Sequence, residues 1–179
     1  MVIYLDNIIF NMQQSGEESS RWAQFIRDLL PMPGIQLRFV EYRNAIANEH
    51  RYKLDLLRRG HLYVMRNLWL TRHLAVRIDG YTTPFIFHSS GYRLCDNPNA
   101  VNIITVDHHF KPSLHNNYAL RRCDRIISTS RAVHAALPLH LKAKSTVVST
   151  KKSNTNIALS VLKLYRSALT AAQSPTAVR

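Results

Sequence analysis

The chain has 179 residues, 46% of them hydrophobic, which is enough to fold as one domain with a hydrophobic core. Lys and Arg total 24 against 11 Asp and Glu, a formal net charge of +13. This surplus favours an anionic partner: nucleic acid, an anionic membrane face or a phosphorylated small molecule. Cys95 and Cys123 match no zinc spacing, and no apolar run approaches the ~20 residues of a spanning helix. We therefore expect a cytoplasmic protein with reduced thiols.

Strand and helix patterns alternate from the start of the chain. Residues 2–5 are short and β-branched, which predicts a buried strand. Apolar residues at i, i+3, i+4, i+7 and i+8 across residues 22–30 predict an amphipathic helix. Residues 35–42 predict a second strand. Residues 52–77 predict a basic helical stretch, broken near Gly60, whose surplus of Lys and Arg suits a phosphate-rich surface.

The same alternation continues to the end of the chain. Further strands are predicted at 84–88, 101–106, 125–129 and 145–149, and further helices at 114–122, 130–137 and 156–172. The last helix is amphipathic, with Lys163 on its polar stripe and Leu162 and Leu169 on its apolar side. Alternating strands and helices predict an α/β fold with a mostly parallel sheet covered on both faces. Ligands bind such sheets at the carboxyl ends of the strands, so we look for a site in the loops there.

The first of these loops ends at a helix start. Its backbone N–H groups near Gly16 and Ser19, together with the helix dipole, favour an anion such as a phosphate. An ordinary connection is the alternative, with Glu17 and Glu18 complementing the dipole themselves. No dinucleotide or nucleotide-triphosphate glycine motif occurs anywhere in the chain, so we expect neither ligand to bind in the usual way. Nucleic-acid-binding signatures are also missing from the sequence.

Two later loops carry histidine. His88 ends a predicted strand, and taken alone such a histidine is more often structural than catalytic. The pair Asp107 and His108 leaves the next strand and suits a general base with its orienting carboxylate, or part of a metal site. With His109 it resembles the Asp-His-His signature of a metal phosphoesterase family. That family needs further aspartates, and Asp6 and Asp79 are the candidates here.

Four segments in order carry a second resemblance. They are Gln14–Trp22, Phe87–Arg93, Asn102–Val106 and Cys123–Ser130. Their succession resembles the N-terminal half of retaining GT-B glycosyltransferases of family 4, the group 1 transferases of bacterial surface polysaccharide assembly. The resemblance implies that residues 1–150 form a Rossmann-like, doubly wound acceptor domain. It also implies that residues 151–173 form a C-terminal helix crossing back onto this domain, with 174–179 as a frayed tail.

The resemblance implies a function that needs a second domain. In the family that domain binds the nucleotide sugar. We therefore expect this chain to be inactive alone and to take part in glycosyl transfer when a donor domain or subunit completes it. The implied acceptor is a phosphorylated or lipid-linked saccharide, with the protein peripheral on the inner face of the cytoplasmic membrane. No metal and no cofactor are implied.

The site roles follow from the same resemblance. His108 lies nearest the reacting centre and Asp107 orients it. The binding residues are Gly16 and Ser19 on the phosphate side of the cleft, with His88, Tyr92 and Arg93 on the acceptor side. Glu17 stands where the family has glycine. A carboxylate ~5 Å from a diphosphate repels it by about 3 kcal/mol per unit charge at an effective dielectric of ~20, so we expect Glu17 to turn outward. Two alternatives stay open: a non-catalytic binding module or degenerate remnant, and the metal phosphoesterase.

Overall fold

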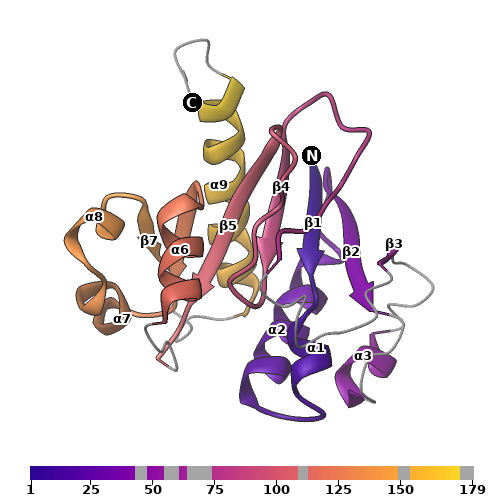
Figure 1. Cartoon of the computed structure of the whole chain (residues 1–179). Helices are drawn as coiled ribbons and strands as arrows, with labels where there is room; N and C mark the ends of the chain where they lie inside the picture. The colour runs from indigo at the N-terminus through magenta and orange to yellow at the C-terminus, as the bar shows by residue number, and fades with distance from the viewer. Residues whose placement is uncertain (43–47, 55–60, 64–73, 109–112, 149–153, 174–179) are drawn as a thin grey trace.

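The short apolar segments of the sequence form the strands of a single sheet. A computed structural model describes residues 1–42, 48–54, 61–63, 74–108, 113–148 and 154–173. Within them, seven parallel strands lie in the order β3-β2-β1-β4-β5-β6-β7, so the chain winds outward from β1 in both directions (Figure 1). This is the order of a doubly wound, Rossmann-like α/β sheet, and it confirms the predicted fold class.

All the strands except β3, which was not predicted, begin and end close to the predicted positions. They are β1 (Val2–Asp6), β2 (Gln36–Tyr42), β3 (His61–Tyr63), β4 (Phe85–Ser89), β5 (Ala100–Val106), β6 (Arg125–Ser128) and β7 (Ser145–Val147). β4 is buried along its whole length between β1 and β5, with Ile86 opposite Ile3 on one side and Val101 on the other. Continuous apolar runs of this kind are typical of parallel strands covered on both faces.

Helices and single helical turns connect the strands. They are α1 (Ile9–Met12), α2 (Glu17–Leu29), α3 (Glu49–Lys53), α6 (Leu114–Arg122), α7 (Arg131–Ala136), α8 (Leu139–Lys142) and α9 (Asn154–Gln173). Those with a clear apolar period, α2, α6, α7 and α9, confirm the prediction. The short elements α1, α3 and α8 were not predicted, because four or five residues are too few to show a period.

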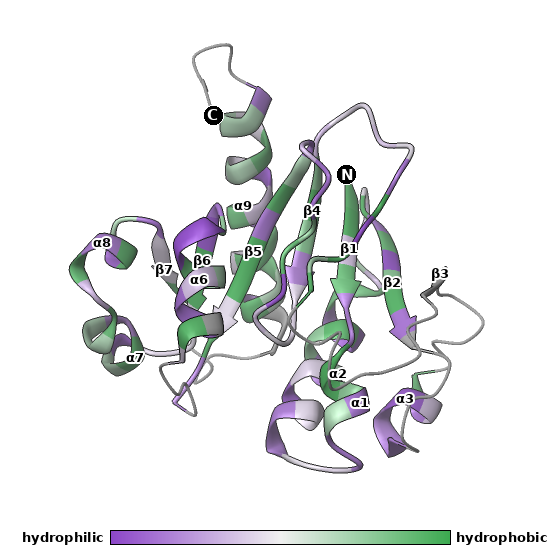
Figure 2. Cartoon of the chain, viewed as in Figure 1, coloured by the Kyte–Doolittle hydropathy of each residue, from purple (hydrophilic) through white to green (hydrophobic). Residues whose placement is uncertain are grey.

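The two faces of the sheet are covered differently. α2 and α9 cover one face, where Ile26 and Val161 join a cluster with Ile103. α6 lies on the opposite side of β5, where Leu120 packs with Ile104 (Figure 1). Figure 2 shows the central strands as mostly hydrophobic and α3 as mostly hydrophilic. This agrees with their burial, since the central strands are buried and most of α3 is exposed. Helices thus cover both faces, as predicted.

The basic helical stretch predicted over residues 52–77 is wrong for most of its described part: Tyr52 and Lys53 end helix α3, but the later described residues are not helical. His61–Tyr63 is strand β3, which pairs parallel with β2 through Val40 and His61. Val76 is extended and forms an isolated parallel β-bridge with Cys95. Pairing with a distant strand overrides local helical preference, and a local window of sequence does not contain that partner. Residues 55–60 and 64–73, which hold most of the predicted stretch, lie outside the described residues.

The final helix crosses the sheet as predicted. α9 contacts α2, β4 and β5, and its buried residues recur at helical spacing. These residues are Ala158, Val161, Leu162, Tyr165 and Ala168. Lys163 is exposed and Leu169 is half-buried. In the part of the chain that the structure describes, no helix has the length and apolarity needed to cross a bilayer.

Leu162 tests how much α9 contributes to stability. Its side chain is only 4% exposed, so Leu162→Ala leaves a cavity and should lower the free energy of unfolding by about 2–5 kcal/mol. The melting temperature should fall by several degrees. Lys163→Ala on the exposed stripe is the control and should change it little. Equal melting temperatures for the two variants would show that α9 does not support the fold.

Candidate functional site

A cavity of about 1130 Å³ opens at the carboxyl ends of β4, β5 and β6. His88, Thr105 and Ile127 line it from the three strands, and α2 and α9 supply further walls. Strand ends gather here because all the strands run in the same direction, so their last residues meet at one edge of the sheet. The cavity is large enough for a ligand of drug size or more.

The lining falls into two parts of different chemistry. We call the first the polar rim, formed by Glu17, Glu18, Arg21, Asp107 and His108. We call the second the apolar wall, formed by Trp22, Phe25, Ile127, Val148, Ile157 and Val161. Asp28 adds a further carboxylate to the lining, and Arg21 is the one Lys or Arg among the described residues that line the cavity. Although the net charge of the chain is +13, carboxylates therefore outnumber Lys and Arg in the lining of this cavity.

Arg21 lies between two carboxylates of the rim. Its Nη2 is 3.3 Å from Glu17 and 3.7 Å from Asp107. Its Nε and Nη2 atoms are buried, and the described residues give neither atom a hydrogen-bond acceptor. A buried guanidinium N–H without an acceptor costs free energy, so a ligand oxygen that reached it would be bound favourably. The side chain of Glu17 is 67% exposed but still lines the cavity, so the expected turn away from a bound ligand stays a prediction.

His88 is a buried neutral residue at the base of the cavity. Its Nδ1 is 2.5 Å from the Tyr165 hydroxyl of α9, and its Nε2 is 2.8 Å from the Thr105 hydroxyl of β5. The rings of Trp22 and Phe25 meet it edge-on at centroid distances of 5.1 and 5.5 Å. Burial lowers the pKa of His88 to about 3, so the ring is uncharged at neutral pH. A neutral imidazole has one donor and one acceptor, and both are used.

The loop after β4 places Tyr92 at the cavity through a tight turn. Tyr92 has φ of 53°, in the left-handed region that residues with side chains rarely adopt. A Cβ atom on Gly91 would lie 2.6 Å from Cγ2 of Ile8, so the backbone passes too close for any other residue. Burial, with Asp107 and Glu18 adding to it, raises the pKa of Tyr92, and its hydroxyl therefore stays protonated.

Arg93 supports the site from behind and does not line the cavity. Its Nε is 3.0 Å from the Asp6 carboxylate, and both side chains are fully buried. Ser89 Oγ donates a second hydrogen bond, 2.8 Å long, to the same carboxylate. The prediction that Arg93 faces an acceptor is therefore corrected: its guanidinium pairs with Asp6 inside the protein. The sequence did not indicate this pair, because the two residues are far apart in the chain. The phosphoesterase interpretation needs Asp6 as a metal ligand, but in the structure the Asp6 carboxylate is paired with Arg93.

Gly16 and Ser19 also lie outside the cavity lining. Gly16 caps α2, and the fully buried Ser19 donates a 3.0 Å hydrogen bond from Oγ to the Gly16 carbonyl oxygen. They fix the start of the helix that carries the polar rim. Of the predicted site residues, the structure thus brings His88, Tyr92, Asp107 and His108 together around one cavity.

Some site residues were not singled out by sequence reasoning. Arg21 stands one helical turn after Glu17, a spacing that signals an ion pair. Tyr165 is buried on α9, but no residue near it in the sequence indicates the bond to His88. Among the described residues no three His, Cys, Asp or Glu side chains are grouped to hold a metal. His109 lies outside those residues.

Comparison of the chain with protein-family models, with curated proteins and with solved structures found no match in any of the three.

The buried His88 should make stability depend on pH. In the unfolded chain its pKa is close to the ordinary ~6.5, so below that pH the unfolded state binds more protons than the folded state. The contribution of His88 is present above pH ~6.5 and is lost as pH falls toward the folded pKa of about 3, at about 1.4 kcal/mol per pH unit.

Urea unfolding at several pH values between 6 and 4 measures this slope. His88→Gln keeps one donor and one acceptor but does not titrate. The wild-type slope should exceed that of the variant by about 1.4 kcal/mol per pH unit. The carboxylates contribute equally to both chains and cancel in the difference. Parallel slopes would mean that His88 is not buried in the neutral form.

Proposed function

We propose that this chain is the acceptor-binding domain of a glycosyltransferase-like enzyme and that its cavity holds a saccharide. The observation that carries the proposal is the lining: carboxylates and aromatic rings meet at the carboxyl ends of the strands. Carboxylates accept hydrogen bonds from sugar hydroxyls, and these charge-assisted bonds are strong. The ring of Tyr92, which lines the cavity near Asp107 and Glu18, offers an apolar surface for the C–H face of a sugar.

The charge of the lining favours a neutral saccharide inside the cavity. Arg21 is the cation of the polar rim, and Glu17 and Asp107 already lie within 4 Å of it. Each carboxylate would repel a phosphate at ~5 Å by about 3 kcal/mol at an effective dielectric of ~20. A phosphorylated acceptor would therefore keep its phosphate outside the rim. The roles expected for Gly16 and Ser19 at a phosphate stay predictions.

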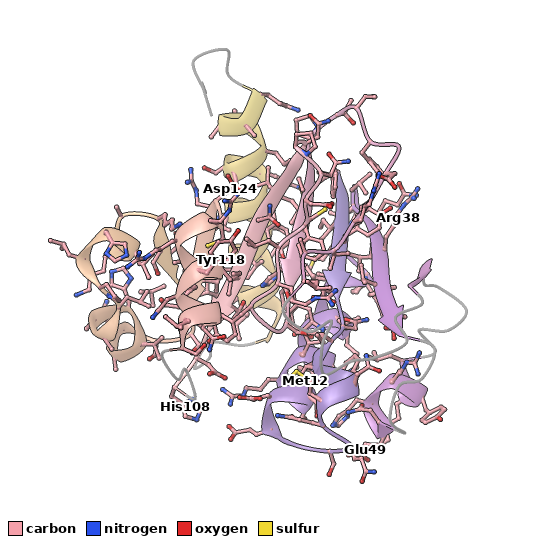
Figure 3. The ribbon with its side chains drawn as sticks, in the orientation of Figure 1. Met12, Arg38, Glu49, His108, Tyr118 and Asp124 are labelled. Carbon is pink, nitrogen blue, oxygen red and sulfur yellow. The ribbon has the colours of Figure 1, made fainter. Side chains whose placement is uncertain are left out.

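His108 is the residue we place nearest the reacting centre. It is exposed and lines the cavity, at the same end of the molecule as Met12, another lining residue (Figure 3). An exposed imidazole at the mouth can meet a sugar donor carried by a second domain or subunit. Asp107 lies next to it, where Arg21 holds its carboxylate at the rim. A non-catalytic saccharide-binding module would use the same cavity without transfer.

Saccharide binding tests this proposal directly. Neutral mono- and disaccharides are screened by saturation-transfer NMR, and the best is titrated by calorimetry. Asp107→Asn should weaken binding by about tenfold or more, since a hydrogen bond to a charged group contributes about 1.5–3 kcal/mol. Asp79→Asn is the control, because Asp79 is 75% exposed and does not line the cavity. Equal affinities for the two variants, or no saccharide binding at all, would contradict the proposal.

We also propose that the α6–β7 side of the molecule meets an anionic membrane face. Positive side chains gather between residues 113 and 148, where the acidic residue is Asp124. They are Arg121, Arg122, Arg125, Arg131, Lys142 and Lys144. Leu139 on α8 is 84% exposed beside them. Arg121, Arg122 and Arg131 are exposed and the other three are half-buried. Basic residues with an apolar neighbour suit a lipid surface with negative headgroups.

Vesicle binding tests this surface. Each arginine near an anionic membrane contributes about 1 kcal/mol, so Arg121→Gln/Arg122→Gln should weaken binding to phosphatidylserine vesicles by about 30-fold. Arg27→Gln, an exposed arginine on α2, is the control and should change little. Added salt should weaken binding of the wild type. Equal binding to neutral vesicles, or preferential capture by RNA, would contradict a membrane role for this side.

A further inference from the structure

The apolar wall extends the cavity into the space between α2 and α9. Trp22 and Phe25 come from α2, and Ile157 and Val161 come from α9. Ile127 at the end of β6 and Val148 just after β7 complete it. The polar rim lies around the start of α2 and the end of β5. The cavity therefore joins a polar part to an apolar part.

The apolar wall offers little for a polar ligand group to bind. His88 and Thr105 lie at the strand ends beside it and are bonded to each other, with the second His88 nitrogen bonded to Tyr165. The other polar lining side chains on α2 beyond the polar rim are Gln24 and Asp28. His88 itself is buried in the neutral form and adds no charge there. A peptide or a nucleobase placed there would lose its hydrogen bonds to water without replacing them, which costs free energy. A hydrocarbon chain would lose none.

We propose that the apolar wall binds the alkyl chain of an amphiphilic ligand whose polar head lies at the polar rim. The identity of the head as a saccharide rests on the proposed function, whereas the chain site rests on the wall itself. A cavity of about 1130 Å³ has room for both parts, since pockets of ~300–1,000 Å³ hold drug-sized ligands.

The physical signature of such a site is its dependence on chain length. Each methylene moved from water to an apolar wall tightens binding by about fourfold. Affinity should therefore rise steadily along a homologous series and then level off once the wall is covered. A site that recognised only the head group would show no such rise.

Two series of probes measure the head and the chain separately. The n-alkyl β-glucosides from methyl to octyl carry both parts, and the n-alkanols from butanol to octanol carry only the chain. Affinities are measured by calorimetry below the micelle concentration. Ile157→Trp fills the wall with a larger ring, whereas Leu159→Trp on the same helix is the control, because Leu159 is 44% exposed and does not line the cavity. Circular dichroism confirms that both variants fold.

We expect affinity to rise about fourfold per methylene for the wild type and for Leu159→Trp, and to be flat for Ile157→Trp. Glucosides that bind equally well at every chain length would overturn the inference and leave the saccharide proposal standing. Alkanols that bind with the steep dependence, while methyl glucoside and free sugars do not bind, would support the chain site and count against the saccharide head. A steep dependence that survives in Ile157→Trp would also overturn the inference.

Discussion

The hydrogen bond between His88 and Tyr165 ties the last helix to the centre of the sheet. His88 is the last residue but one of β4, the fully buried strand beside β1, and its other nitrogen bonds to Thr105 near the end of β5. Three elements that are far apart in sequence therefore meet at one imidazole. Because α9 supplies part of the apolar wall, the shape of the cavity depends on this contact. Burial keeps this ring neutral, because the charged form would lose its hydration.

A second constraint lies behind the cavity, where charges are buried in pairs. Asp6 and Arg93 join the end of β1 to the loop after β4, and Glu41 and Arg51 join the end of β2 to α3. Taking such charges from water costs several kcal/mol, and only close pairing offsets the cost. Neither loop can move far without separating a pair. The left-handed turn at Tyr92 is held in this way, and its backbone strain of about 1–3 kcal/mol is balanced by the packing around it.

The sequence predicts most of the fold because the long elements carry their own periodicity. α2 and α9 follow from apolar spacing, and the ends of β4 and β5 bring His88 and His108 to one edge, as the parallel sheet requires. β3 was missed because its partner β2 is outside any local window. The role of Arg93 was missed for the same reason: Asp6 is 87 residues earlier, and only the folded chain brings them together.

Positive and negative charges are separated among the residues that the structure describes. Carboxylates surround the cavity, while the α6–β7 side is rich in arginine and lysine. A negatively charged surface would exert a torque on such a molecule before contact. The torque would turn the arginine-rich side toward the surface and the mouth of the cavity away from it. The electric field of these charges would thus favour one orientation of the protein as it approaches the surface. The effect acts within a distance set by the salt concentration. The acidic lining would then remain open to the solution, where a small neutral molecule can enter it.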